Sequence, residues 1–214
     1  DRELACLPSS SKTGTAYFKS MAAAANFAWC NREVITQEIR NAWVHLFGKS
    51  GGGLSLVYDV AHNIAKIEEH KLEGINQKLI VHRKGATRAF GPGFQELPEA
   101  YRSAGQPVLI PGSMGTASYV LAGTGKSMEA TFGSACHGAG RRMSRRAAKR
   151  KVKGRELQDE LRNRGIHIRA GSLSGIAEEA PEAYKDVDLV VETVHEAGIA
   201  RKVAKLVPVA VVKG

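Results

Sequence analysis

Apolar side chains recur every three or four positions through the first part of the chain. This spacing places them on one face of an α-helix, and Gly48 is a residue type that ends helices. We therefore expect a long helix over residues 13–47, with its aromatic residues in the core rather than in a ligand-binding surface. The residues of that face are Tyr17, Met21, Ala25, Ala28, Ile35, Ile39, Trp43 and Leu46.

After this helix, short apolar runs alternate with glycine, proline and asparagine, which is typical of short strands joined by turns. Strands are predicted at 54–60, 65–70, 78–82, 106–110, 117–122, 166–170 and 203–212, with helices at 156–164 and 184–197. The second and third strands flank Glu73-Gly74 and should form a hairpin. The whole pattern predicts one α+β domain over residues 1–214, with mixed sheets of short strands, a long N-terminal helix and glycine-rich active-site loops.

The composition is that of an ordinary soluble globular protein, with 43% hydrophobic and 24% charged residues in 214. No apolar run is long enough to cross a bilayer, and the N-terminus lacks a signal-peptide pattern, so no membrane partner is expected. Cys6, Cys30 and Cys136 form no Cys-x-x-Cys motif. Such sparse cysteines favour a reducing, cytoplasmic location.

The formal net charge of +10 suggests a polyanionic partner. Much of this excess lies in one run, which could also be a solvated helix face. Its basic residues are Arg141, Arg142, Arg145, Arg146, Lys149, Arg150, Lys151, Lys153 and Arg155.

Just before this run, His137 lies among residues too small to cover it. Glycines at 133, 138 and 140 allow a close backbone approach to a ligand. A neutral imidazole can act as a nucleophile, and arginine can hold phosphate while it reacts. The alternative is a flexible glycine loop whose histidine only caps a turn.

Two further segments are candidates for ligand binding. His62 lies at a predicted strand end, where a side chain is held beside loops and could bind a metal, or could simply bond to the backbone. His70 and His82 have no ligands at zinc-site spacing. The loop 111–118 has glycines and two serines that could wrap a nucleotide, although it could equally be a plain connection.

Four motifs together resemble the RtcB family of GTP-dependent RNA-splicing ligases. They are His82-Arg-Lys-Gly-Ala-Thr-Arg88, Pro111-Gly-Ser-Met-Gly-Thr, Cys136-His-Gly-Ala-Gly-Arg141 and the terminal Lys213-Gly214. The resemblance implies that His137 attacks the α-phosphate of GTP with the help of manganese. The guanylate then passes to an RNA 3′-phosphate, which a 5′-hydroxyl attacks as GMP leaves. A 2′,3′-cyclic phosphate end is first hydrolysed.

The resemblance also implies roles for individual residues. His62 corresponds to a ligand of one of two Mn²⁺ ions, and Lys84 and Arg145 to groups that bind the RNA phosphate, with Arg83 and Arg141 as weaker candidates. Residues corresponding to the nucleotide site are Asn63, Pro111, Gly112, Ser113, Met114, Ser118, Gly138, Ala139, Gly140, Tyr184 and Lys213.

In the family, the other metal ligands (an aspartate, a cysteine and two histidines) lie upstream of the segment that Asp1 begins here. We therefore expect the chain to be the carboxy-terminal part of such a ligase and to need the upstream part. Expected partners are GTP, RNA ends such as tRNA halves, and an archease-like activator. Two alternatives stay open: a non-catalytic basic RNA-binding module, and a metal-dependent nuclease or phosphatase that uses His62.

Overall fold

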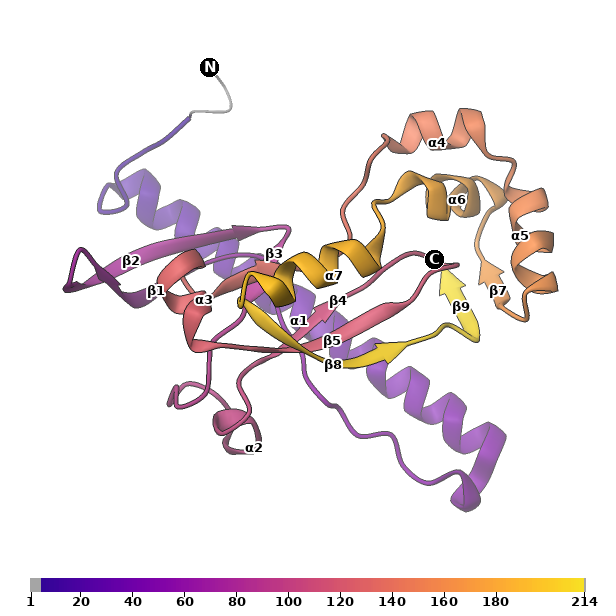
Figure 1. Cartoon of the computed structure of the whole chain (residues 1–214), viewed down its shortest axis with the longest axis horizontal. Coiled ribbons are helices and arrows are strands. Elements are labelled where there is room, and N and C mark those ends of the chain that lie inside the picture. Colours follow the sequence, from indigo (N-terminus) through magenta and orange to yellow (C-terminus); the bar gives the residue numbers. More distant parts are fainter. Residues whose placement is uncertain (1–4, 214) are drawn as a thin grey trace.

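The computed structural model describes residues 5–213, and the side chains of Lys49 and Lys213 lie outside that description. The ends of the proposed family match, Asp1-Arg-Glu-Leu and Gly214, also lie outside it. Helices and small sheets are mixed along the chain, which confirms the α+β class. Helices α4, α5 and α6 gather at the end of the molecule opposite the β1–β2 hairpin (Figure 1). In the described range, no helix has the length and apolar character needed to span a membrane.

The long N-terminal helix is confirmed as α1 (Lys12–Phe47). The Ser11 hydroxyl caps it by accepting from the Gly14 N–H, and Gly48 ends it with a φ of 56°. One side of α1 packs on the hairpin, where the Ala65 N–H contacts the Met21 sulfur at 3.3 Å.

The expectation that the aromatic residues of α1 are core was wrong for Tyr17, which is exposed. The apolar pattern is wider than the side of the helix that the hairpin covers. Its exposed members in this structure are Tyr17, Ala28, Ile35, Ile39 and Leu46.

The strand predicted at 54–60 was also wrong. This segment follows η2 (Gly48–Gly51) and forms no strand. It lies along α1 instead, where Arg32 binds Asp59 at 2.8 Å and the Arg40 side chain donates to the Leu54 carbonyl. Side chains of the helix thus replace a neighbouring strand as its hydrogen-bond partners.

The predicted hairpin is confirmed as β1 (Asn63–Leu72) and β2 (Ile75–Lys84), antiparallel from Asn63↔Lys84 to Leu72↔Ile75. Glu73 and Gly74 form its turn with positive φ angles. The open end of the hairpin therefore brings Asn63 beside Lys84, although they are far apart in sequence.

The other strands form a three-stranded antiparallel sheet in the order β4-β5-β8, an antiparallel pair β3-β6 and a parallel pair β7-β9. Their bounds are β3 (Ala86–Arg88), β4 (Pro107–Ile110), β5 (Ser118–Gly123), β6 (Ser134–Cys136), β7 (His167–Ala170), β8 (Ala200–Leu206) and β9 (Ala210–Lys213). The tail predicted as one strand is two, because Pro208 interrupts it and its halves join different sheets.

The remaining helices are α2 (Glu99–Arg102), α3 (Gly125–Thr131), α4 (Arg145–Lys151), α5 (Gly154–Asn163), α6 (Leu173–Glu178), η3 (Pro181–Ala183) and α7 (Val187–Glu196). Helix α7 begins later than predicted because the Asp186 side chain caps it. Tyr184 therefore lies outside the helix, where it forms a backbone bridge with Arg141.

Two clusters of buried side chains form the core. One joins β4 and β5 to α7 through residues such as Ile110 and Val191. The other joins α5 and α6 through residues such as Leu161 and Ile176, and it includes Met114. The loop 111–118 runs from the first cluster to the second and is anchored in both.

Candidate functional site

The fold brings together the two histidines that the sequence singled out. Their ring centroids lie 4.2 Å apart, with 31° between the ring planes. Gly85 links the two backbones, because its N–H donates to the His62 carbonyl at 3.0 Å and its carbonyl accepts from the His137 N–H at 3.4 Å. The end of the hairpin and the end of β6 therefore build one site.

The surroundings of His137 favour its neutral form. Partial burial, the adjacent His62 and the Lys84 ammonium all lower the pKa of His137. A hydrogen bond with its own backbone acts in the other direction and is outweighed. A lowered pKa leaves a nitrogen lone pair free near neutral pH, as a nucleophile requires.

The described residues do not form a complete metal centre. Between residues 5 and 213, no three His, Cys, Asp or Glu side chains are arranged to hold a metal ion. The predicted ligand His62 has a second imidazole beside it but no carboxylate completing a group, and carboxylate oxygens are the donors that manganese prefers. A site for two manganese ions does not fit these residues alone.

Asn63 and Lys84 pair with each other at the open end of the hairpin, next to the histidines. Both side chains are exposed. The Asn63 side-chain oxygen accepts from the Gly85 N–H at 3.3 Å, so it supports the link between the two histidines. Lys84 is close enough to His137 to affect its pKa.

A cavity of about 480 Å³ collects most of the predicted nucleotide-binding residues. Tyr184 and the loop 111–118 form one side of it. The other side was not predicted: Glu179 and the segment from Leu206 to Val212 complete the wall. No local motif marks this segment, whose position depends on how β9 pairs with β7. The predicted residues in the lining are Pro111, Gly112, Ser113, Met114, Ser118 and Tyr184.

The cavity loop is held in shape by its own hydroxyl groups. The Gly112 N–H donates to Ser118 Oγ at 3.3 Å, and the Ser113 N–H donates to Thr116 Oγ1 at 2.7 Å. Met114 is buried in the core below the loop. These contacts set the loop shape before any ligand binds.

The segment after His137 borders the same cavity. The Ala139 N–H donates to the Pro111 carbonyl at 3.1 Å, and the Gly140 carbonyl accepts from the Lys185 N–H at 2.9 Å. Ala139 therefore contacts one residue of the cavity wall, Pro111, and Gly140 contacts Lys185, the neighbour of the wall residue Tyr184. Lys213 belongs to β9, where its backbone pairs with Ala170, and its side chain is outside the description.

Tyr184 is fixed in the cavity wall by two charged groups. Its hydroxyl donates to the Glu179 carboxylate and accepts from Arg141 at 3.0 Å. The Arg141 guanidinium also lies 4.8 Å from the centre of the Tyr184 ring. Burial and the Glu179 carboxylate raise the pKa of Tyr184, so its hydroxyl keeps its proton.

Arg145, predicted to bind RNA phosphate, lies beside the carboxylates of Glu178 and Glu179. Its Nε is 3.6 Å from both Glu178 and Glu179, and 67% of its side chain is exposed. These exposed ion pairs are weak and leave much of the guanidinium accessible to a ligand.

Arg83, the weaker RNA candidate, is buried in a cluster that the sequence did not reveal. Its two Nη atoms bind the two oxygens of Glu68 at 2.7 and 2.8 Å. It also donates to Ser134 Oγ and to the Phe132 carbonyl, each at 2.9 Å. Arg83 cannot reach RNA from here. It joins the hairpin to the strand that leads to His137.

Burial alone would raise the pKa of Glu68, but hydrogen bonds from Arg83 and His70 outweigh it and leave that pKa lowered. Glu68 is therefore a carboxylate inside the protein. An alternation pattern cannot predict such a pair, because it marks Glu68 and Arg83 only as polar positions.

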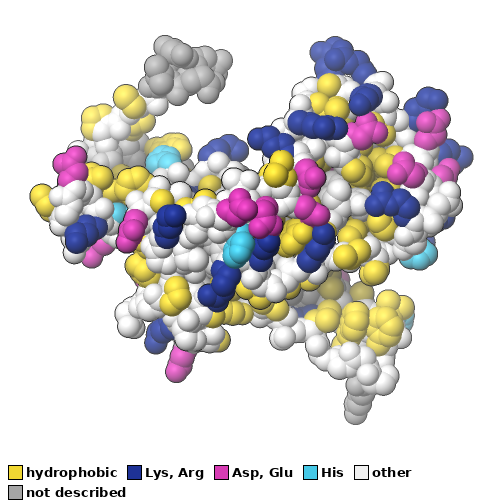
Figure 2. Space-filling model, in the orientation of Figure 1, with side chains coloured by type: hydrophobic (Ala, Val, Ile, Leu, Met, Phe, Trp, Pro, Cys, Tyr) yellow, Lys and Arg dark blue, Asp and Glu magenta, His cyan; other side chains and the backbone are white. Residues whose placement is uncertain are grey.

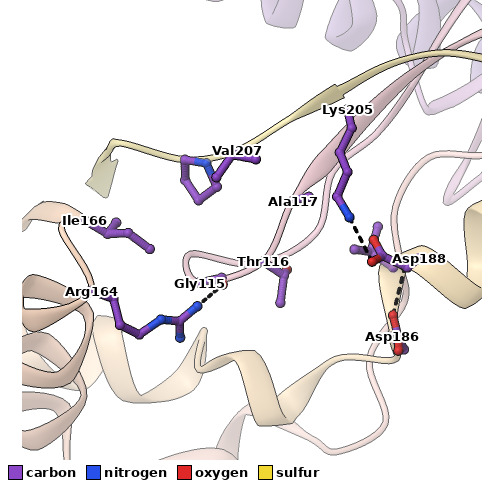
Figure 3. Close-up of a pocket in the computed structure, with 11 residues that line it drawn as sticks. Gly115, Thr116, Ala117, Arg164, Ile166, Asp186, Asp188, Lys205 and Val207 are labelled. Carbon is purple, nitrogen blue, oxygen red and sulfur yellow. Dashed lines mark hydrogen bonds and ion pairs between the residues drawn. The ribbon is translucent and has the colours of Figure 1, made fainter.

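A second cavity, of about 350 Å³, adjoins the first and shares Thr116, Val207 and Pro208 with it (Figure 3). None of the predicted site residues whose side chains the structure describes lines it. Its cations already have partners: Arg164 donates to the Gly115 carbonyl at 2.8 Å, and Lys205 binds Asp188 at 2.9 Å. Arg164 thus supports the loop 111–118 from outside.

Comparison with known proteins identifies the family of the chain. The family described as tRNA-splicing ligase RtcB matches residues 1–214. Proteins named tRNA-splicing ligase RtcB from Archaeoglobus fulgidus, Pyrococcus abyssi and Methanococcus maripaludis are 59%, 58% and 53% identical to it over the whole chain. The chain spans 45%, 24% and 45% of their respective lengths, less than half of each. The chain belongs to the RtcB family.

Proposed function

We propose that this chain is the nucleophile-bearing part of an RNA ligase. The ligase joins RNA 3′-phosphate or 2′,3′-cyclic phosphate ends to 5′-hydroxyl ends, as in tRNA splicing, through a guanylate carried on His137. The observation that carries this proposal is the position of His137. It lies beside His62 and near Lys84, two residues before Ala139, whose N–H donates to Pro111 in the wall of the 480 Å³ cavity.

In the first step, an imidazole nitrogen of His137 bonds to the α-phosphorus of GTP while the α–β anhydride bond breaks and pyrophosphate leaves. An oxygen of the RNA 3′-phosphate then attacks the same phosphorus and releases His137. Finally, a 5′-hydroxyl oxygen attacks the RNA phosphate, loses its proton and displaces GMP. Each step moves negative charge among phosphate oxygens, so nearby cations should contribute most to catalysis.

The side chains of the site divide between GTP and RNA. The loop 111–118, Tyr184 and Lys213 would hold guanosine, and Lys84 and Arg145 would bind the phosphate of the RNA end. Bound manganese would screen the triphosphate charge, with His62 as one ligand and the others from outside residues 5–213. An archease-like activator stays a prediction.

The first test is covalent labelling. The complete protein, given α-labelled GTP and manganese, should acquire an acid-labile, base-stable label, because a phosphoramidate has that stability. His137→Ala should abolish the label, whereas His45→Ala, an exposed histidine on α1, should keep it. Label that persists on His137→Ala would refute the assigned nucleophile. An unlabelled wild type that still binds RNA would favour the non-catalytic module.

A substitution of Arg145 tests which site residues bind GTP and which bind the RNA end. Arg145→Ala should reduce the sealing of RNA ends more than it reduces formation of the guanylate. An equal loss in both steps would place this arginine in the GTP site.

A further inference from the structure

The basic residues around α4 form two sets, one that pairs with carboxylates of the protein and one that does not. One set faces acidic residues of α6 and η3: Arg145 lies over Glu178 and Glu179, Lys149 binds Glu178 at 2.6 Å, and Lys151 binds Glu182 at 2.9 Å. The carboxylates offset part of the charge of this set, while 67% of the Arg145 side chain stays exposed.

The second set is Arg142, Arg146 and Arg150, one at every fourth position. All three are exposed, and within the described part of the chain none lies within ion-pair distance of a carboxylate, although Arg142 is near enough to help lower the pKa of Glu182. The Arg142 side chain is fixed by donating to the Glu182 carbonyl at 2.8 Å. Arg146 and Arg150 are about one helical turn apart, or roughly 6 Å along the axis. Figure 2 shows Lys and Arg side chains gathered over α4.

This arginine stripe (Arg142, Arg146 and Arg150) begins next to the candidate site. A shallow, open depression in the surface is lined by residues 141–146. One of these residues, Arg141, contacts Tyr184 in the wall of the nucleotide cavity. The depression therefore adjoins that cavity through Arg141 and reaches the first turn of α4.

We propose that the arginine stripe binds the phosphate backbone of the RNA strand, several nucleotides away from the end that reacts. This inference rests on the proposed function and adds a surface to it. Lys84 and Arg145 would bind the reacting phosphate, and the stripe would bind the strand behind it.

The chemistry of this surface favours a nucleic-acid backbone over an acidic protein. Protein interfaces usually need apolar or aromatic anchors at their centre. Within residues 141–155, no large apolar side chain is exposed, and the sequence there contains no aromatic residue. The stripe has no aromatic ring on which successive bases could stack, and guanidinium groups bind phosphates in bidentate geometry, so it should bind mainly phosphates and with little regard to sequence.

The test measures RNA binding by the complete protein at several salt concentrations. The probe is a labelled single-stranded RNA with a 3′-phosphate, without GTP, so that no ligation occurs. The test variant combines Arg142→Gln, Arg146→Gln and Arg150→Gln. Its matched control combines Lys149→Gln, Lys151→Gln and Lys153→Gln, which removes the same charge from the same region but only from ion-paired residues.

The arginine variant should bind RNA at least about tenfold more weakly at low salt. Its plot of log affinity against log salt should be shallower by about 2, because each phosphate contact on a single strand contributes about 0.7. The lysine variant should retain most of the wild-type slope, and both variants should form the His137 guanylate normally.

Equal losses of RNA affinity in the two variants would contradict the proposed role of the arginine stripe, because they would reflect overall charge alone. Unchanged RNA binding by the arginine variant would overturn it too, and would direct attention to an acidic protein as the partner. Failure of the wild type to form any guanylate would instead refute the proposed function, so the two failures can be told apart.

Discussion

The backbone of Gly112 passes so close to Ala117 that a Cβ atom on Gly112 would lie 2.2 Å from the Ala117 carbonyl oxygen. The same atom would lie 2.5 Å from Thr116 Oγ1, which holds the loop through Ser113. Gly112→Ala must therefore open the loop that lines the nucleotide cavity. We expect it to weaken GTP binding by about tenfold or more, roughly the effect of a lost 1.4 kcal/mol, in an equilibrium binding measurement.

Gly138→Ala is the matched comparison, since Gly138 is also a predicted nucleotide contact. Its Cβ would lie 3.6 Å from the Pro111 carbonyl oxygen, an ordinary contact. The free energy of unfolding should change by less than about 0.5 kcal/mol. If Gly112→Ala binds GTP as well as the wild type does, the loop is not the nucleotide site.

Arg141 provides a second prediction, because its guanidinium group donates hydrogen bonds to several groups at once. It donates to the Glu178 carbonyl at 2.5 Å, the Met143 carbonyl at 3.1 Å and the Tyr184 hydroxyl at 3.0 Å. Arg141→Lys keeps the charge but cannot reproduce this geometry. Thermal or chemical unfolding should show a loss of about 1–3 kcal/mol, together with weaker GTP binding.

Arg142→Lys is the control for that change, because the Arg142 side chain is exposed and donates to one carbonyl, that of Glu182. It should be nearly neutral for stability and for GTP binding. Equal effects at the two positions would show that Arg141 does not organise the cavity wall.

Local patterns predicted the elements well where the secondary structure of a segment is determined by its own residues. The period of α1 and the Glu73-Gly74 turn between two strands are of this kind. The predictions were wrong where the structure of a segment depends on contacts with residues far away in the sequence. Residues 54–60 bond to side chains of α1 rather than to a strand, and the tail divides between two sheets at Pro208.

The candidate site follows the same rule. The sequence marked His62, His137 and the loop 111–118, because glycines and isolated histidines stand out locally. It could not mark Glu179 in the cavity wall or the buried position of Arg83. Both depend on contacts between segments that only the folded chain brings together.

Lys84 provides a third prediction, since it is exposed at the open end of the hairpin near His137. Lys84→Gln should lower the rate of RNA sealing by about tenfold or more, the loss expected for a cation that stabilises a transferring phosphate. Lys78→Gln, an exposed lysine near the hairpin turn, should have no effect. Both rates can be measured in single-turnover ligation, and equal rates for the two variants would contradict a role for Lys84.

The buried pair of Glu68 and Arg83 predicts a pH-dependent effect on stability. Glu68→Gln leaves the Arg83 guanidinium buried without its counter-charge, which should cost about 3–5 kcal/mol near neutral pH. The Glu69→Gln control, on the same strand, should cost little, because Glu69 is exposed and lies 4.0 Å from Lys78.

The pH dependence of this loss follows from the lowered pKa of Glu68. A lowered pKa in the folded state means that the charged carboxylate stabilises the protein fully above its ordinary value of 4.5. That stabilisation is lost as the pH falls through the lower, folded-state value. The difference in unfolding free energy between wild type and Glu68→Gln should therefore be constant near neutral pH and shrink in acid. A difference that stays constant into the acid range would mean that Glu68 contributes by shape and not by charge.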